Sequence, residues 1–86
     1  MSRQPISYDH LRARVDQIAA SILCMPGQTL SDAPLESQGA DSLDAIEMAL
    51  MIEEEWGLQI ADDDLETLAT LEDIARFVAA ELGIEA

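Results

Sequence analysis

The sequence predicts an all-α fold, a small bundle of four helices in which the third helix along the chain is short. Three observations lead to this prediction. Alanine, leucine, isoleucine and methionine make up most of the apolar residues and only three residues are aromatic, which favours helices over strands. Apolar residues recur at helical spacing in three segments. The 86 residues suffice for one domain with a small core, so we expect residues 1–86 to form a single domain with frayed ends at 1–6 and 84–86.

The first helix is expected over residues 8–23. Ser7 precedes it and suits the N-cap position, where a serine oxygen accepts a hydrogen bond from one of the first free backbone N–H groups. Apolar residues then follow at helical spacing, at Leu11, Val15, Ile18 and Ile22. The connection over 25–40 is long, and such loops are usually functional or ordered by their own contacts. We expect Leu30 and Leu35 to pin it to the core.

The second helix is expected to begin at Asp41 or Ser42 and to end near Trp56, because the following glycine suits a helix C-terminus. Its predicted apolar face consists of Leu43, Ile46, Ala49 or Leu50, and Trp56, widened by Met48 and Met51. The other side of this helix carries Asp44, Glu47, Glu53 and Glu54.

A short third helix is expected over about 62–68, since the aspartates at 62–64 suit the positive end of a helix dipole. These aspartates lack the spaced ligands and the glycine of a calcium loop, so no metal site is predicted. The last helix is expected over 71–82, with Thr70 and Asp73 as a capping pair before it and Gly83 after it. Its inward residues are predicted to be Leu71, Ile74, Phe77, Val78 and Leu82.

The chain is strongly acidic, with eighteen acidic residues, four arginines, no lysine and a formal net charge of −14 at pH 7. Fourteen of the acids lie within residues 41–86, where Arg76 is the only basic residue. Nucleic acid and an anionic membrane surface would repel such a chain, whereas a basic patch on a partner protein would attract it. The alternative is an acidic surface that only keeps a small protein in solution.

The single cysteine, Cys24, excludes an internal disulfide, and we expect it to be a small apolar residue near the end of the first helix. No apolar run is long enough to span a membrane. The first seven residues lack the apolar stretch of a secretory signal. A monomeric protein of the cytoplasm is therefore the default expectation.

Ser42 is the most informative residue, because it stands between a loop with Gly39 and the periodic segment that starts at Leu43. At such a helix N-terminus the first N–H groups are free and the dipole is positive, which suits a phosphate ester on the serine oxygen. A serine needs an adjacent base to act as a nucleophile by itself, and the only histidine, His10, lies on another helix. Ser42 is therefore predicted to be modified by another enzyme. A simple helix cap is the alternative.

The segment Gly39-Ala40-Asp41-Ser42-Leu43 closely resembles the site in acyl carrier proteins that receives 4′-phosphopantetheine. The resemblance continues through residues 44–48, 53–56 and 70–74. In this family the serine takes phosphopantetheine from coenzyme A, and the thiol of the arm carries acyl groups as thioesters between enzymes. The resemblance therefore implies a free-standing carrier of the acyl carrier protein fold, with the arm on Ser42 and no catalytic activity of its own.

The resemblance also implies partners: a phosphopantetheinyl transferase, a ligase or acyltransferase that loads the thiol, and synthases of fatty-acid, polyketide or related metabolism that use the thioester. These enzymes would hold the acidic side of the second helix with arginines and lysines. The residues implied in this partner-binding face are Asp41, Leu43, Asp44, Glu47, Leu50, Glu53 and Glu54. A solvated helix face without a partner is the alternative.

An acyl pocket between the helices is a further implication of the resemblance. The residues at the positions that line it in the family are Ile46, Ala49, Ile52, Ile60, Leu65, Leu68, Ile74 and Phe77. Ordinary core packing is the first interpretation for each of them, and a pocket requires that the helices part around a chain.

Two other functions stay open. An aminoacyl or peptidyl carrier has the same fold, but its motif more often has a second glycine where this chain has Ala40. An unmodified acidic helical adaptor would bind basic partners without using Ser42. The chain also departs from the usual family pattern at Gln38, where an apolar leucine commonly anchors the loop. We therefore expect altered packing beside Ser42 and a specialised member of the family.

Overall fold

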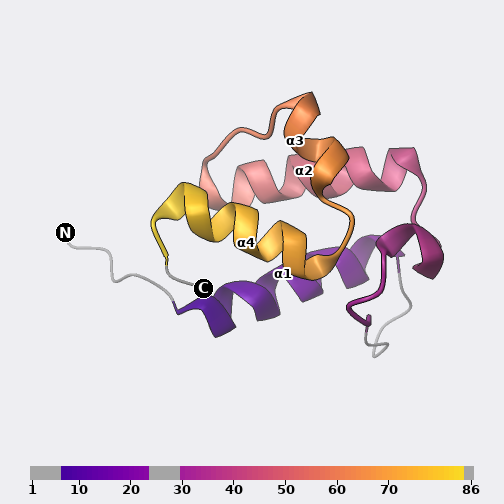
Figure 1. Ribbon diagram of the computed structural model, residues 1–86, viewed down its shortest axis with the longest axis horizontal. Coiled ribbons are helices and arrows are strands. Elements are labelled where there is room, and N and C mark those ends of the chain that lie inside the picture. Colours follow the sequence, from indigo (N-terminus) through magenta and orange to yellow (C-terminus); the bar gives the residue numbers. More distant parts are fainter. Residues whose placement is uncertain (1–6, 24–29, 85–86) are drawn as a thin grey trace.

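The computed structural model describes residues 7–23 and 30–84, and these form helices without any strand (Figure 1). The α-helices are α1 (Tyr8–Leu23), α2 (Ser42–Trp56), α3 (Asp62–Thr67) and α4 (Leu71–Leu82), and a 3-10 helix, η1 (Leu35–Gln38), precedes α2. The predicted all-α bundle with a short third helix is confirmed. The expectations for residues 1–6 and for Cys24 lie outside the described residues.

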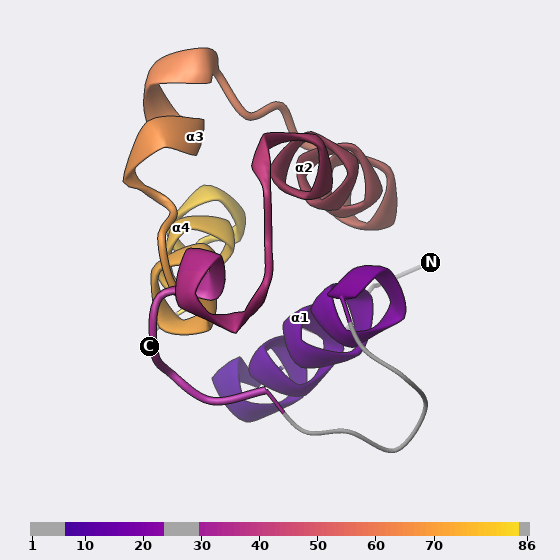
Figure 2. The same cartoon turned by 90° about the vertical axis from the view of Figure 1, so that its right-hand side faces the viewer.

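Helix α1 packs against both α2 and α4, and α3 lies on the side of α2 and α4 that is away from α1 (Figure 2). The core lies between α1, α2, α4 and η1. Its buried residues are Leu11, Val15, Ile18, Ala19, Leu35, Met48, Ile52, Leu71, Ile74, Ala75, Val78 and Ala79. Helix α3 contributes no fully buried residue to this core, so it covers the bundle from outside.

Two capping boxes set the starts of α2 and α4. The Asp41 carboxylate accepts from the Asp44 N–H at 2.9 Å, and the Asp44 carboxylate accepts from the Asp41 N–H at 3.1 Å. Thr70 and Asp73 repeat this arrangement at 3.0 and 3.2 Å. A glycine in the left-handed conformation ends each of the two helices. These local features explain why the helix limits agree with the sequence prediction.

The buried face of α2 differs from the predicted one. Met48 and Ile52 are its buried residues, whereas the prediction centred the apolar face on other residues of this helix. The apolar residues of α2 that are exposed are Leu43, Ile46, Leu50 and Met51. Because each residue turns the helix by about 100°, Ile46 lies about 200° away from Met48. A helix that is apolar around most of its circumference offers two stripes, and its periodicity does not decide which one faces the core.

The last helix follows the predicted spacing more closely. Leu71, Ile74 and Val78 are buried as predicted, but Leu82 in the last turn is exposed. Ile84, in the segment that we expected to fray, packs against the core. Its N–H also donates to the carbonyl oxygen of residue 79 at 2.8 Å. The chain therefore turns back onto the core after α4 ends.

Candidate functional site

Ser42 is the first residue of α2 and is exposed. Gly39 precedes it with φ 104°, in the left-handed region that favours glycine. The N–H groups of Gly39 and Ala40 donate to the carbonyl oxygens of Glu36 at 3.3 Å and Leu35 at 3.1 Å. The end of η1 and this glycine turn thus lead directly into the N-terminus of α2, where Ser42 lies at the surface.

The two carboxylates beside Ser42 are oriented by the capping box. Asp41 and Asp44 each accept a backbone N–H of the other residue, so their side chains lie around the first turn of α2. A negative charge at this helix end is favourable because the dipole there is positive. The same dipole and free N–H groups suit a phosphate ester on the Ser42 oxygen.

An open cavity of about 400 Å³ reaches Ser42 from the space between η1, α2, α3 and α4. Its volume lies in the usual range of small-molecule sites, about 300–1,000 Å³. The side chains of Leu35, Met48, Ala49, Ile52, Ile60, Leu65, Leu68 and Ile74 form its apolar lining. Glu36, Asp41 and Glu66 are the charged residues that line it, and none of the lining residues is basic.

Six of the eight predicted pocket residues line this cavity: Ala49, Ile52, Ile60, Leu65, Leu68 and Ile74. The expectation that Ile46 points inward is wrong, because Ile46 is 48% exposed on the outer side of α2. Phe77 is half-buried and packs against the core without lining the cavity. The prediction missed Leu35 and Met48 as lining residues, although the spacing of Met48 and Ile52 by four was a usable signal.

In the structure, most of the predicted partner-binding residues lie on the outer side of α2, whereas Glu53 does not lie free at the surface. Leu43 and Leu50 are exposed and form one row with Ile46, at positions i, i+3 and i+7. This row of three residues is called the α2 stripe below. Glu47 and Glu54 are exposed, and the helical period puts them on the same side as the stripe.

Glu53 has a different environment from the other predicted partner-binding residues. It is half-buried, and its Oε2 accepts from the Ile60 N–H at 2.7 Å. This hydrogen bond ties the end of α2 to the segment before α3. Glu53 therefore stabilises a connection at the edge of the cavity, and its carboxylate is not free in the way that those of Glu47 and Glu54 are.

The arginines of the described residues all pair with carboxylates. Arg14 holds Glu55 with two hydrogen bonds of 2.8 and 2.9 Å. Arg76 pairs with Glu72 at 2.8 Å. Arg12 pairs with Asp32 and lies 3.4 Å from Asp16 and 3.9 Å from Glu72. In the described part of the chain, the acids on the outer side of α2 and on α3 have no such partner.

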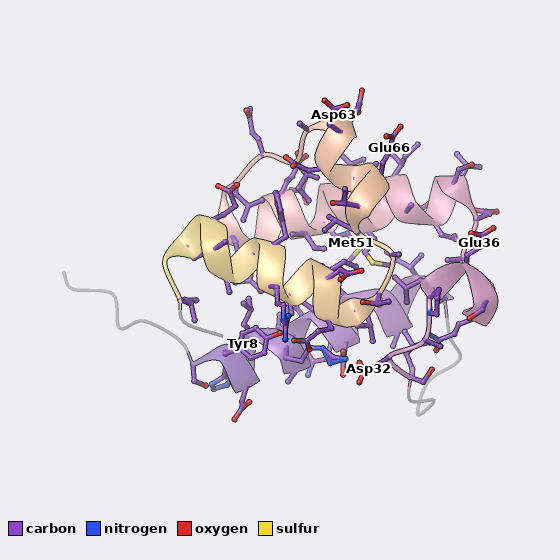
Figure 3. The ribbon with its side chains drawn as sticks, in the orientation of Figure 1. Tyr8, Asp32, Glu36, Met51, Asp63 and Glu66 are labelled. Atoms are coloured by element: carbon purple, nitrogen blue, oxygen red, sulfur yellow. The ribbon has the colours of Figure 1, made fainter. Side chains whose placement is uncertain are left out.

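The positive and negative charges are thus distributed unevenly over the molecule. Asp63 points outward from α3, whereas Asp32 lies against α1 on the other side of the bundle (Figure 3). Asp41 and Asp44 at the start of α2, together with Glu66 in the cavity lining, place negative charge beside Ser42. Such negative charge attracts a basic partner and repels nucleic acid.

Residues 7–23 and 30–84 contain neither a metal-ligand cluster nor a membrane-spanning helix. No group of three or more histidine, cysteine, aspartate or glutamate side chains in this part could hold a metal ion. None of its helices has the length and apolar character that a membrane crossing requires.

Comparison with known proteins adds the decisive observation. The family model described as the phosphopantetheine attachment site matches residues 13–78, a span that covers most of the chain and includes Ser42. The chain belongs to this family. As a phosphopantetheine-binding carrier domain it has a covalent 4′-phosphopantetheine arm, as the resemblance implied.

The fold of this carrier domain is similar to that in the crystal structure of an acyl carrier protein from Thermotoga maritima. The two chains are 22% identical, the TM-score is 0.75, and the match covers 94% of this chain and 96% of that one. The likeness confirms the predicted fold. The exposed hydroxyl at the start of a 15-residue helix and the apolar cavity beside it fit a phosphate ester that bears a long arm.

Proposed function

We propose that this carrier domain is an acyl carrier protein and that its arm is attached to the Ser42 oxygen. The observation that carries the proposal is the position of Ser42, exposed at the N-terminus of α2 and at the edge of the apolar cavity. The arm would carry acyl groups as thioesters between the enzymes of fatty-acid, polyketide or related synthesis. The chain itself catalyses none of these steps.

A phosphopantetheinyl transferase would supply the base that Ser42 needs. In that transfer the Ser42 oxygen attacks the phosphorus that bears the pantetheine of coenzyme A. The bond from this phosphorus to adenosine 3′,5′-bisphosphate breaks, and the serine proton passes to the base of the transferase. The role of the carrier is to present Ser42 at the surface and to bind the transferase.

The apolar lining of the cavity supports hydrocarbon cargo. A hydrocarbon chain gains about 25 cal/mol for each Å² that it buries against this lining. Acyl groups with a second carboxylate would meet the charges of Glu36, Asp41 and Glu66, which line the cavity. We therefore favour uncharged acyl chains, held between α2 and α3.

The α2 stripe and the acids around it support binding to enzymes with an apolar spot inside a basic docking patch. The proposed partner-binding residues are Asp41, Leu43, Asp44, Ile46, Glu47, Leu50 and Glu54. Exposed leucine and isoleucine side chains in a row favour protein contacts, and the acids speed association and select basic partners. Helix α2 would then bury one apolar stripe in the core and offer the other to partners.

Intact-mass analysis tests the proposal. The protein is incubated with coenzyme A, Mg²⁺ and a broad-specificity phosphopantetheinyl transferase, beside the Ser42→Ala variant. We expect one phosphopantetheine on the parent protein and none on the variant, with identical circular dichroism. A folded parent that gains no mass with several transferases, and is not already modified, would favour an unmodified acidic adaptor. Loading by an amino-acid ligase alone would favour an aminoacyl carrier.

A further inference from the structure

The side chain of Gln38, the last residue of η1, forms three hydrogen bonds to the loop that precedes η1. Its Oε1 accepts from the Ser31 N–H at 2.9 Å. Its Nε2 donates to the carbonyl oxygens of Ser31 at 3.1 Å and Ala33 at 2.8 Å. The partners settle the orientation of the amide, because a carbonyl oxygen only accepts and an N–H only donates.

This carboxamide binds exposed backbone groups that a leucine would leave to water. It pairs with both the N–H and the C=O of Ser31, as a neighbouring peptide group would do, and it binds a second carbonyl in addition. The altered packing that we expected beside Ser42 thus takes the form of a specific polar contact at Gln38. A half-buried side chain that uses both of its donors in this way holds the loop in one conformation.

Helix η1 is consequently held at both of its ends. At its start, Leu35 is buried and its N–H donates to the carbonyl oxygen of Ala69 at 2.8 Å, which ties η1 to the segment before α4. At its end, Gln38 binds residues 31–33, and Asp32 within that loop pairs with Arg12 of α1. The turn at 39–41 that leads to Ser42 starts directly from this doubly anchored helix.

We propose that Gln38 is a positioning residue for the modification of Ser42, an inference that rests on the proposed function. Through its three hydrogen bonds it holds η1 and the turn after it, and thereby the Asp41 cap that keeps Ser42 in the first turn of α2. A transferase that docks on α2 must find the serine oxygen in line with its bound coenzyme A. Small displacements from such geometry cost one to two orders of magnitude in rate.

Three variants test the proposal in steady-state assays of phosphopantetheine transfer. Gln38→Glu keeps the shape but turns two donated hydrogen bonds into contacts between a carboxylate and two carbonyl oxygens. Gln38→Leu removes all three hydrogen bonds without a new charge. Gln59→Glu is the matched control, since Gln59 is exposed and its side chain has no hydrogen bond to the described residues. Circular dichroism and melting curves establish that each variant is folded at the assay temperature.

We expect kcat to fall about tenfold in both Gln38 variants. KM should stay within about twofold of the parent value, because the α2 stripe is unchanged. The control should keep both constants. Partial unfolding alone would not lower kcat in the Gln38 variants while their stability and KM stay close to the parent values. Exchange of the Ser31 amide proton should accelerate in Gln38→Leu, which lacks the side-chain acceptor, and not in the Gln59→Glu control.

Three outcomes would overturn the inference. These are a parent-like kcat in both Gln38 variants, a loss in Gln38→Glu without a loss in Gln38→Leu, and an equal loss in the control. If Gln38→Glu does not fold, Gln38→Leu and Gln38→Ala decide the question. A parent protein that is never modified would refute the proposed function together with this inference. A modified parent with unimpaired Gln38 variants would refute this inference alone.

Discussion

At the scale of single residues, neighbouring acids of this protein have different tasks. Glu53 and Glu54 are adjacent, yet the Glu53 carboxylate accepts the Ile60 N–H whereas Glu54 is exposed. Glu55, the next residue, accepts hydrogen bonds from both Nε and Nη2 of the Arg14 guanidinium. One run of three glutamates thus contains a loop anchor, a free surface charge and a tie between helices.

The first prediction separates the loop anchor from the surface charge. Glu53→Ala should lower the free energy of unfolding by about 1 kcal/mol, because the Ile60 N–H loses a charged acceptor. Glu54→Ala should change it by less than about 0.5 kcal/mol, as surface substitutions usually do. Urea denaturation of the two variants measures both values. Equal values would show that the Glu53 hydrogen bond adds no stability.

The second prediction concerns pH. The hydrogen bond from Arg14 lowers the pKa of Glu55 below its ordinary value of 4.5. A lowered pKa in the folded state means that the pair stabilises the protein above pH 4.5 and that this contribution is lost as the pH falls through the folded-state pKa. Since the pair is partly exposed, we expect about 0.2–1 kcal/mol.

Urea denaturation of the parent and of Glu55→Gln should therefore give different free energies of unfolding at pH 7. The difference should shrink as the pH falls well below 4.5, because both proteins then carry an uncharged group at this position. A difference that stays constant down to pH 3 would contradict the assignment of the pair. Comparison of the two proteins at each pH cancels the effects of the other acids.

At the scale of the helices, α2 is the element whose two sides do different work. Its inner side buries Met48 and Ile52, and its outer side exposes the α2 stripe between acids. The mean composition of the helix does not distinguish these sides. Helix α3, by contrast, buries no residue fully and forms a wall of the cavity, so its contribution is to cover the site and not to build the core.

The third prediction compares the two sides of α2. Ile52→Ala should lower the free energy of unfolding by about 2–5 kcal/mol, since it opens a cavity in the core. Ile46→Ala should change stability by less than about 0.5 kcal/mol, yet it should lower kcat/KM for the transferase because the α2 stripe loses its central contact. Denaturation and transfer assays on both variants are needed. A strongly destabilised Ile46→Ala would place Ile46 in the core after all.

At the scale of the whole molecule, the charges are separated. The cations of the described residues are paired on α1, α4 and the end of α2, so the start of α2 and α3 keep unpaired acids. A net charge of −14 on 86 residues opposes the compact state at low salt. The same separation would orient the protein toward the basic partners proposed above.

The fourth prediction follows from this separation. Glu47→Lys should lower kcat/KM for the transferase about tenfold at low salt, chiefly because association slows. Glu81→Lys, an equal charge change at an exposed site of α4, is the control and should have a much smaller effect. The difference between the two should diminish in high salt. Equal effects of both variants would argue against a recognition surface on α2.

The fifth prediction concerns salt and stability. Raising the ionic strength from about 0.01 to 0.5 M should raise Tm by several degrees, because the Debye length shrinks and the acids repel one another less. Thermal melts followed by circular dichroism at constant pH measure this response. A Tm that does not change, or that falls, would show that the arginine pairs outweigh the repulsion among the acids.

What the sequence by itself determined is local in origin. The limits of α1 and α4, the capping boxes at Asp41 and Thr70, and the place of Ser42 at a helix start depend on residues within a few positions of one another. Six of the eight residues that the family resemblance placed in a pocket also line the observed cavity. Local hydrogen bonds and motif spacing were therefore enough to predict the fold class and the position of Ser42 at the start of a helix.

The tertiary structure alone decided which stripe of α2 is buried. It excluded Ile46 from the cavity and placed it on the surface, because Met48 and Ile52 on the other side of α2 join the core cluster with residues of α1 and α4. It also gave Gln38 its three partners in a loop that the helical period does not describe. These outcomes depend on contacts between distant segments, as with Arg14 and Glu55, which are 41 residues apart. Such contacts arise only when the helices pack.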